Sequence, residues 1–593
     1  MSGLDRACTL PDLVLHAAAS DRGIDFKGLD RRGPHHGYAQ LVARARGVAA
    51  RLRAEGVLPG DRVALVLETS PEFFDAWFGA LLAGAVPACL YPPVRLGRLR
   101  DYHRRTADMV GAIGARVVIA SRVVARLLGK TRELVGPRVA FARIEDWRGA
   151  RDDGVPVPPI DPDALALIQF SSGTTVAPKP VALTHRQLLA NLASMIGWFG
   201  GDVARHVTVS WLPLYHDMGL VGAAMLSLVA PTPLVLVRPE HFVARPQLWL
   251  QAISDARATV TVAPNFAYGL CVERIDDKAL KGVDLSCLEV ALNGAEPVHP
   301  GTIARFVARF APYGLKPEVM TPVYGLAEVG LAVSFAPKGK VSVPVAFAAD
   351  ALEVELEAVL DRGAGEETRE LASVGPPLAG NAIEIRDEFR APLGERRVGS
   401  VWVQGPSLMH GYHGLPEATA QVKVDGWLDT GDLGFLLDGE LYLCGRAKDV
   451  LVLRGRNHDP AAIEQAASEL DGVRKGCVIA LALPLPDEDS DGLLLLVERR
   501  REGEREDEAL AIALHQAALE ACGVAPTDVV LLEPGTLPRT SSGKLRRSTA
   551  LRQYMAGELT PPDRVTWFSM ARELFESWLA HRRVAAAEDR RRT

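Results

Sequence analysis

The sequence predicts an α/β protein with a large N-terminal domain of parallel-type sheets wrapped by helices, a β-rich subdomain within it, and a small mobile α+β C-terminal domain. Three observations predict this architecture. Apolar runs of strand length alternate with amphipathic helical patterns through the first half of the chain. Short strands punctuated by glycines dominate residues 399–447, and strands alternate with helices again beyond residue 448. Because 593 residues exceed what one hydrophobic core can serve, we expect domains at 1–447 and 448–555 and a helical tail at 556–593.

Composition and charge narrow the class of protein. The chain is 48% hydrophobic and 24% charged with a net charge of −6, which is typical of a globular protein and argues against a nucleic-acid binder. Its seven scattered cysteines favour free thiols in a reducing compartment over disulfides or a zinc site. No secretory signal opens the sequence, so a cytoplasmic location is expected. The uncharged stretch Met218–Val237 contains two prolines, which predicts a buried helix and strand rather than a membrane span.

The first elements follow from periodicity. Residues 38–56 carry apolar side chains on one face and arginines on the other, which predicts an amphipathic helix. A buried strand is expected at 61–70, and a helix beginning with Pro71 at 71–85. Apolar runs at 87–93 and 114–121 continue the alternation of strands and helices, which indicates a mostly parallel sheet.

The stretch from Leu167 to Gln187 is predicted to contain a phosphate-binding loop. An apolar strand runs into a cluster of small hydroxylated residues, and Thr184 and Gln187 have the spacing of a capping box at the start of a helix. Hydroxyl groups, backbone N–H groups freed by a glycine, and the charge of Lys179 could converge there on phosphate oxygens. The glycine spacing of a P-loop is absent, and a solvated loop is the alternative. The predicted loop comprises Ser171, Ser172, Gly173, Thr174 and Thr175.

Further candidate residues follow predicted strands, at the edge where open α/β sheets bind ligands. His216 and Asp217 end the first of these runs. Their alternatives are a core histidine paired with a surface aspartate, or a hydrolytic Ser-His-Asp site, although no G-x-S-x-G elbow is present.

Two later turns could hold a flat polar ring and a metal ion. The run at 288–298 ends in Asn293, Gly294, Ala295 and Glu296, which bares backbone groups. Residues 318–335 offer Tyr324 as a stacking face beside Gly325 and Leu326, and Glu328 as an oxygen ligand suited to Mg²⁺. Asp432, between two glycines, could accept two hydroxyl groups, with a tight-turn aspartate as the alternative.

The C-terminal region carries a basic loop. The chain changes character after Arg446, and a helix with Asp459 as N-cap is expected beyond a boundary near Lys448. The segment LPRTSSGKLRR contains Lys544 among arginines, which suggests an anion partner over a solvated face. The tail is predicted to form one or two amphipathic helices whose apolar residues are Trp567, Phe568, Leu574, Phe575, Trp578 and Leu579.

These motifs resemble the adenylate-forming superfamily of acyl-CoA synthetases, adenylation domains and luciferases over residues 35–550. The resemblance rests on SSGTTVAPKP, NGAEP, YGLAE, DGWLDTGDLG, GRAKD and SSGK. Within that superfamily, LYPPVRLGRL, WLPLYHDMGL, RGRNHDP and LPRTSSGKLRR look most like the fatty acyl-AMP ligases. Such enzymes activate a fatty acid with ATP and Mg²⁺ and pass it to an acyl carrier protein, here expected to be a separate chain or part of a polyketide or nonribosomal peptide synthase.

The resemblance also implies a role for each matched residue. Ser171 to Thr175 would hold the β- and γ-phosphates, and Gly294, Ala295, Glu296 and the YGL segment would hold the adenine. Asp432 and Arg446 would bind the ribose, Glu328 the Mg²⁺, and His216 would lie at the entrance of the acyl pocket. Lys448 matches the hinge, and Lys544 would bridge the carboxylate and the α-phosphate.

The acceptor of the acyl group depends on one insertion. The stretch 337–376 is longer than expected for CoA ligases and resembles the insertion of fatty acyl-AMP ligases, which is thought to restrain the C-terminal domain. A variable surface excursion is the alternative for the stretch. For the whole chain, the alternatives are an acyl-CoA synthetase, an amino-acid adenylation domain and a non-catalytic ATP-binding scaffold.

Overall fold

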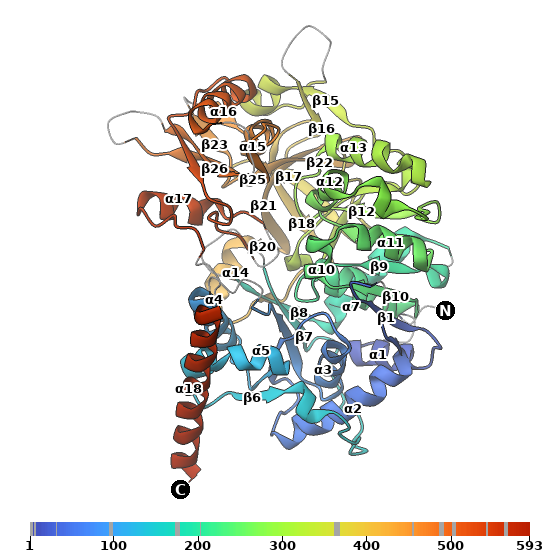
Figure 1. Ribbon diagram of the computed structural model, residues 1–593. Coiled ribbons are helices and arrows are strands. Elements are labelled where there is room, and N and C mark those ends of the chain that lie inside the picture. Colours follow the sequence, from blue (N-terminus) through green and yellow to red (C-terminus); the bar gives the residue numbers. More distant parts are fainter. Residues whose placement is uncertain are drawn as a thin grey trace.

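A computed structural model describes residues 4, 7–30, 33–93, 99–171, 178–201, 203–360, 368–453, 456–485, 491–500, 506–540, 544–562 and 567–592. Two large sheets form the centre of the body, by which we mean the residues up to 446 (Figure 1). A C-terminal unit, residues 449–555, lies against one side of the body and contributes strands and helices of its own (Figure 1).

The first sheet has seven strands and confirms the alternation predicted for the N-terminal region. β4, β3, β5, β6 and β7 pair in parallel, whereas β8 and β19 add to the edge in antiparallel sense. The expected helices are α2 (Tyr38–Ala54) and α3 (Pro71–Leu82). In order across the sheet, the strands are β19 (Gly411–Tyr412), β8 (Pro180–Thr184), β7 (Leu165–Phe170), β4 (Val86–Leu90), β3 (Arg62–Val66), β5 (Val117–Ala120) and β6 (Ala140–Arg143).

The second sheet has eight strands, six of which are parallel neighbours, so their carboxyl ends share one edge. This edge is where the candidate residues of the strand-end loops were expected. The order across the sheet is β14 (Ala332–Phe335), β13 (Met320–Gly325), β12 (Val290–Asn293), β11 (Val260–Ala263), β9 (Thr208–Ser210), β10 (Leu234–Val237), β1 (Gly23–Lys27) and β2 (His35–Gly37).

The sequence predicts that a helix follows the phosphate loop directly, and this prediction is wrong in one respect. The loop after β7 leads into β8, which pairs antiparallel with β7, and only then into α7 (His185–Phe199). The capping box of Thr184 and Gln187 is confirmed, with hydrogen bonds of 2.9 and 3.2 Å. The run Pro180–Thr184 is fully buried, and as a strand between β7 and β19 its backbone groups find hydrogen-bond partners that a buried loop would lack.

The uncharged stretch from residue 218 is buried in the body, as expected. It forms a π-helical segment at Leu220–Met225, continues as α9 (Leu226–Val229), and ends in β10. The π-helical turn was not predicted, because its apolar pattern is indistinguishable from that of an α-helix. Within the described residues, no helix combines the length and the apolar character that crossing a bilayer requires.

An antiparallel sheet forms the expected β-rich region. It contains β17 (Ala382–Arg386), β18 (Gly399–Gln404), β20 (Lys423–Val424), β21 (Trp427–Leu437) and β22 (Glu440–Arg446), and the short helix α14 (Pro416–Val422) interrupts it. Two smaller strands, β15 (Val345–Ala348) and β16 (Thr368–Leu371), come from the predicted insertion.

The C-terminal unit has two hydrophobic clusters formed by its own residues and the segment that follows it. The expected N-cap is confirmed, because the carboxylate of Asp459 accepts a hydrogen bond from Ala461 N. The elements are β23 (Leu451–Leu453), β24 (Arg456–His458), α15 (Pro460–Ser468), β25 (Val473–Leu483), β26 (Gly492–Arg499), α16 (Asp507–Cys522), β27 (Asp528–Leu532) and α17 (Arg547–Met555).

All seven cysteines lie in the described part of the chain, and all are free thiols, as expected. Only Cys89, Cys271 and Cys477 are buried.

A buried histidine makes the fold sensitive to acid. Nδ1 of His185 accepts a hydrogen bond from Leu10 N (3.0 Å), a donor at the start of α1 (Leu10–Ala18) that has no partner within its own helix. Burial lowers the pKa of His185 to about 4. In the unfolded chain the imidazole of His185 has an ordinary pKa near 6.5. As the pH falls, the unfolded state therefore takes up this proton before the folded state does, and folding becomes less favourable.

We expect His185→Gln to reduce this acid sensitivity. In the wild-type protein, the pKa difference of His185 alone should lower the free energy of unfolding by about 3 kcal/mol as the pH falls from 6.5 to 4. Glutamine keeps an acceptor for Leu10 N but takes up no proton. Urea unfolding from pH 7.5 to 4.5 measures the difference, with the exposed His515→Gln as control. An unchanged pH dependence in His185→Gln would show that other groups control acid unfolding.

Candidate active site

A cavity of about 2270 Å³ lies between the body and the C-terminal unit. It is lined by loops at the carboxyl ends of β9, β11, β12 and β13, by β21 and β22, and by the loop that carries Lys544. Pockets for one small ligand usually measure 300–1,000 Å³, so this cavity has room for a large ligand or for two ligands side by side.

His216 and Asp217 line the cavity beyond β9. Nδ1 of His216 lies 2.6 Å from Oδ1 of Asp217, which also accepts a hydrogen bond from Met218 N (2.7 Å). Burial raises the pKa of Asp217, but the charge and hydrogen bond of His216, together with the charge of Lys544, outweigh it and hold this pKa below its ordinary value. Both side chains are largely buried, so the alternative of a surface aspartate is wrong.

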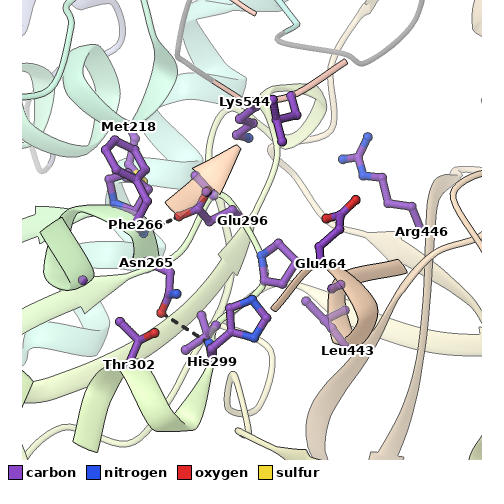
Figure 2. A pocket seen from close by; sticks show the side chains of 18 of the residues that line it. Met218, Asn265, Phe266, Glu296, His299, Thr302, Leu443, Arg446, Glu464 and Lys544 are labelled. Atoms are coloured by element: carbon purple, nitrogen blue, oxygen red, sulfur yellow. Dashed lines mark hydrogen bonds between the residues drawn. The ribbon is translucent and has the colours of Figure 1, made fainter. Parts of the chain in front are cut away.

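The loop after β12 brings backbone groups to the cavity, as expected. A Cβ at Gly294 would lie 2.6 Å from the carbonyl oxygen of Val323, so only glycine lets this loop approach β13 so closely. Ala295 adopts a left-handed conformation with φ of 66°. Oε1 of Glu296 accepts a hydrogen bond from Phe266 N (2.5 Å), and Figure 2 shows this carboxylate below the side chain of Lys544.

Tyr324 and Asp432 join the two sheets that wall the cavity. The hydroxyl of Tyr324, at the end of β13, donates to Oδ2 of Asp432 on β21 (2.6 Å). Oδ1 of Asp432 lies 3.0 Å from Nε of Arg446, its cross-strand partner on β22. Asp432 therefore lies within a strand, which rules out the tight-turn alternative. Gly325 and Leu326 continue from Tyr324 along the wall of the cavity.

Glu328 has a partner that the sequence did not reveal. The hydroxyl of Tyr412 donates to Oε1 of Glu328 (2.9 Å), and Nζ of Lys179 lies 4.5 Å from the centre of the Tyr412 ring. Burial raises the pKa of Glu328. Tyr412 stands on β19, which pairs with β8 next to the phosphate loop. Which carboxylate the Tyr412 hydroxyl reaches depends on packing between distant segments, which the sequence does not report.

The donors near Glu328 suit a magnesium ion that also has ligands from outside the protein. Mg²⁺ in such sites is held by one or two carboxylates together with phosphate oxygens and water. No group of three or more His, Cys, Asp or Glu side chains able to hold a metal occurs among the described residues. Glu328 thus fits as a single protein ligand of such an ion.

Only part of the predicted phosphate loop can be described. Ser171 N donates to Lys179 O (2.9 Å) and Lys179 N to Oγ of Ser171 (3.3 Å), so these two residues close the base of the loop. Nearby, the amide nitrogen of Gln169 donates to Tyr215 O, whereas its buried Oε1 has no partner among the described residues, which favours a polar ligand there. Ser172, Gly173, Thr174 and Thr175 lie outside the described residues.

Lys544 enters the cavity from the C-terminal unit (Figure 2). Burial and the charge of Arg446 lower the pKa of its ammonium group, and the carboxylates of Glu296, Asp217 and Asp432 oppose this change. A mutual hydrogen-bond pair with Thr540 fixes its backbone, at 2.7 Å from Thr540 N to Lys544 O and 3.0 Å from Lys544 N to Oγ1 of Thr540. Lys448 also lines the cavity, between β22 and β23.

The structure thus brings residues from six separate segments of the sequence to one cavity. The cavity carries charges of both signs, because a buried lysine and an arginine lie opposite several carboxylates. The cations could bind an anionic substrate, and the carboxylates could accept hydrogen bonds from its hydroxyl groups. The predicted residues that line this one cavity are Ser171, Lys179, His216, Asp217, Ala295, Glu296, Tyr324, Gly325, Leu326, Glu328, Asp432, Arg446, Lys448 and Lys544.

The chain is similar to known proteins over most of its length. The model of a protein family described as AMP-binding enzyme matches residues 17–413. A putative acyl-CoA synthetase from Caulobacter vibrioides is 35% identical over 555 residues, which cover 93% of this chain and 96% of the relative. The medium-chain-fatty-acid–[acyl-carrier-protein] ligase JamA from Moorena producens is 33% identical and covers 88% and 90%. The long-chain-fatty-acid–AMP ligase FadD26 from Mycobacterium tuberculosis is 34% identical and covers 93% and 96%.

Solved structures of fatty acyl-adenylate ligases are similar to the chain in fold and in sequence. A structure from studies of fatty acyl-adenylate ligases of E. coli and L. pneumophila superposes with a TM-score of 0.88 at 34% identity, covering 94% of this chain and 99% of the other. A fatty acyl-adenylate ligase from L. pneumophila in complex with acyl adenylate and pyrophosphate gives a TM-score of 0.72 at 28% identity, covering 93% and 97%.

Proposed function

The chain belongs to the family of AMP-binding enzymes, and from this premise we propose that it joins a fatty acid to AMP and passes the acyl group to a separate acyl carrier protein. The observation that carries the proposal is Lys544, which reaches the cavity where Asp432, Arg446 and Glu328 meet. The relatives named as a fatty-acid–AMP ligase and as an acyl-carrier-protein ligase support the same reaction. ATP is the second substrate.

The first step forms one bond and breaks one. An oxygen of the fatty-acid carboxylate attacks the α-phosphorus of ATP, and the bond from that phosphorus to the pyrophosphate oxygen breaks. No proton needs to move, so catalysis consists of positioning anions and neutralising charge. Lys544 would donate to the carboxylate and the α-phosphate together. Mg²⁺, held by Glu328 and phosphate oxygens, would supply further neutralising charge when bound.

Other residues would orient the two substrates. Asp432, held by Tyr324 and Arg446, would accept the ribose hydroxyls, and the segments Gly294–Glu296 and Tyr324–Leu326 would flank the adenine. The loop from Ser171 to Thr175 would hold the β- and γ-phosphates. Apolar side chains suited to an acyl chain also line the cavity, among them Met195, Phe199, Trp211, Leu226 and Phe335.

We expect Tyr412→Phe to weaken metal binding. Without the hydroxyl, Oε1 of Glu328 loses the partner that fixes its orientation, and loss of such a partner typically costs 10–100-fold in metal affinity. The Mg²⁺ concentration for half-maximal activity should therefore rise about tenfold. Electron paramagnetic resonance of Mn²⁺ in the presence of ATP gives a readout independent of turnover. Tyr102→Phe, which removes a hydroxyl bonded to Tyr91 O elsewhere in the body, is the control.

The insertion holds the C-terminal unit through ion pairs. Arg369 on β16 pairs with Asp459, at the start of α15, and with Glu353 (3.8 Å). Nδ1 of His458 lies 3.9 Å from the same Glu353. Arg369 and Asp459 have mostly buried side chains, so their pair is worth more than an exposed one. This contact supports a restrained C-terminal unit and hence a carrier protein rather than CoA as acceptor.

Releasing that contact should allow CoA to react. We expect Arg369→Ala to form acyl-CoA at a rate at least tenfold above wild type, with adenylate formation within about threefold. The control is Arg397→Ala, because Arg397 pairs with Glu357 (3.5 Å), a residue of the body. If the Arg369→Ala variant folds but forms no more acyl-CoA than wild type, the role given to the insertion is contradicted.

Mass spectrometry of the products tests the proposal as a whole. The protein is incubated with Mg-ATP and a mixture of medium- and long-chain fatty acids, with and without CoA. Acyl-adenylate that persists in the presence of CoA is the expected result. Conversion to acyl-CoA would make the protein an acyl-CoA synthetase. Stabilisation by ATP without any product would indicate a non-catalytic scaffold.

A further inference from the structure

The last helix of the chain returns to the body. α18 (Trp567–Arg592) follows the C-terminal unit in sequence, but it packs against α5 (Arg122–Leu127) and α6 (Gly129–Val135) of the body. Figure 1 shows it beside these N-terminal helices, away from α15, α16 and α17. The reaction proposed above gives this helix no role.

Ser577 and His581 of α18 complete the junction of α5 and α6. Oγ of Ser577 accepts a hydrogen bond from Gly129 N (2.8 Å) and donates to Arg126 O (2.6 Å). Nε2 of His581 lies 2.9 Å from Ala125 O. The end of one helix and the start of the next leave such backbone groups without partners inside the helices. α18 thus supplies caps for both helices, so its docking is specific.

The docked face of α18 is made of small side chains. Ser577, Ala580 and Val584 are buried, and a Cβ at Gly129 would lie 2.0 Å from the carbonyl oxygen of Ser577. The tail thus forms one helix, where the sequence predicts one or two. Close approach to α6 requires small residues, and the side chains of Leu574, Phe575, Trp578 and Leu579 are exposed instead.

Ion pairs flank the buried contact. Lys130 pairs with Glu573 (3.4 Å) and with Glu576, and Arg583 pairs with Glu133 (3.3 Å). Because these pairs are partly exposed, each adds little stability, and the buried hydrogen bonds of Ser577 carry more of the attachment.

The C-terminal unit is consequently attached to the body at both ends. One attachment is the chain at Lys448, and the other is the segment 556–566 leading to α18. Eleven residues span at most about 40 Å when fully extended. We infer that α18 is an anchor that limits rotation of the C-terminal unit about Lys448 and so keeps Lys544 at the cavity. This inference rests on the proposed function, in which acyl transfer follows movement of the unit.

Distance measurements test the anchor directly. Spin-labelled unnatural amino acids replace two exposed residues, Ile512 on α16 and Leu58 in the body. Gly129→Ala forces α18 away from α6, and Ser577→Leu does so from the other side. Gly111→Ala is the control on α4 (Leu99–Ala112), because no described atom lies within 4 Å of its added Cβ. The wild-type protein and the control should give one narrow distance distribution, and both undocked variants a broad one.

Partial reactions separate this inference from the proposed function. In the undocked variants, adenylate formation should stay within about twofold of wild type, and acyl transfer to a carrier protein should be about three- to tenfold faster. Distance distributions that match wild type in both variants would overturn the anchor. A wild-type protein that forms no acyl-adenylate would overturn the proposed function, while the distance measurement would still decide whether α18 restrains the unit.

Discussion

Lys544→Ala should lower the rate of acyl-adenylate formation by about 10²–10³-fold and leave ATP binding within about threefold. The loss has the size seen when one preorganised donor to a developing charge is removed. Lys544 is buried where it faces Glu296, Asp217 and Asp432, and its removal takes away the positive group that would screen the meeting of carboxylate and α-phosphate. ATP binding depends mainly on Asp432, Arg446 and the phosphate loop, so it should survive.

Two measurements check this result. Pyrophosphate release gives the rate, and titration calorimetry with ATP gives the affinity. Lys475→Ala is the matched control, because Lys475 belongs to the same unit and its exposed pair with Glu273 (3.2 Å) contributes little. A rate within tenfold of wild type in Lys544→Ala would show that another group neutralises the charge.

The sequence predicted the strand-end loops well, for a physical reason. Each apolar run that ends in polar or glycine residues marks a strand whose carboxyl end is exposed at the edge of a parallel sheet. The runs ending at His216, Asn293 and Tyr324 all end at the same sheet edge. The resemblance to fatty acyl-AMP ligases is confirmed by the relatives and by the solved structures.

Contacts between distant segments could not be predicted. The bonds from Tyr412 to Glu328, from Arg369 to Asp459 and from Phe266 to Glu296 each join residues 30 to 90 positions apart. Periodicity reports which face of an element is apolar, but not which polar group a side chain meets. Hydrophobicity likewise marks the aromatic residues of α18, but it does not report that close packing against α6 buries Ser577.

Asp432→Asn should lower kcat/KM for ATP by about 10²-fold and leave the KM for the fatty acid within about threefold. Each hydrogen bond to a charged group is worth about 1.5–3 kcal/mol, and the ribose would lose two that involve a full negative charge. Asparagine also turns an amide toward Arg446, whose Nε now lies 3.0 Å from the carboxylate, so the arginine would lose its ion pair. Tyr324 keeps an oxygen acceptor, and the fold should hold.

A second substitution on the same hairpin distinguishes this effect from damage to the sheet. Asp438→Asn lies at the turn between β21 and β22, where φ is 52° and asparagine is tolerated. Its kinetics should match wild type, and the urea midpoints of both variants should stay close to that of the unchanged protein. If Asp432→Asn instead raises the KM for the fatty acid and spares that for ATP, the carboxylate faces the acyl substrate. Asp432 and Arg446 would then belong to the other half of the cavity.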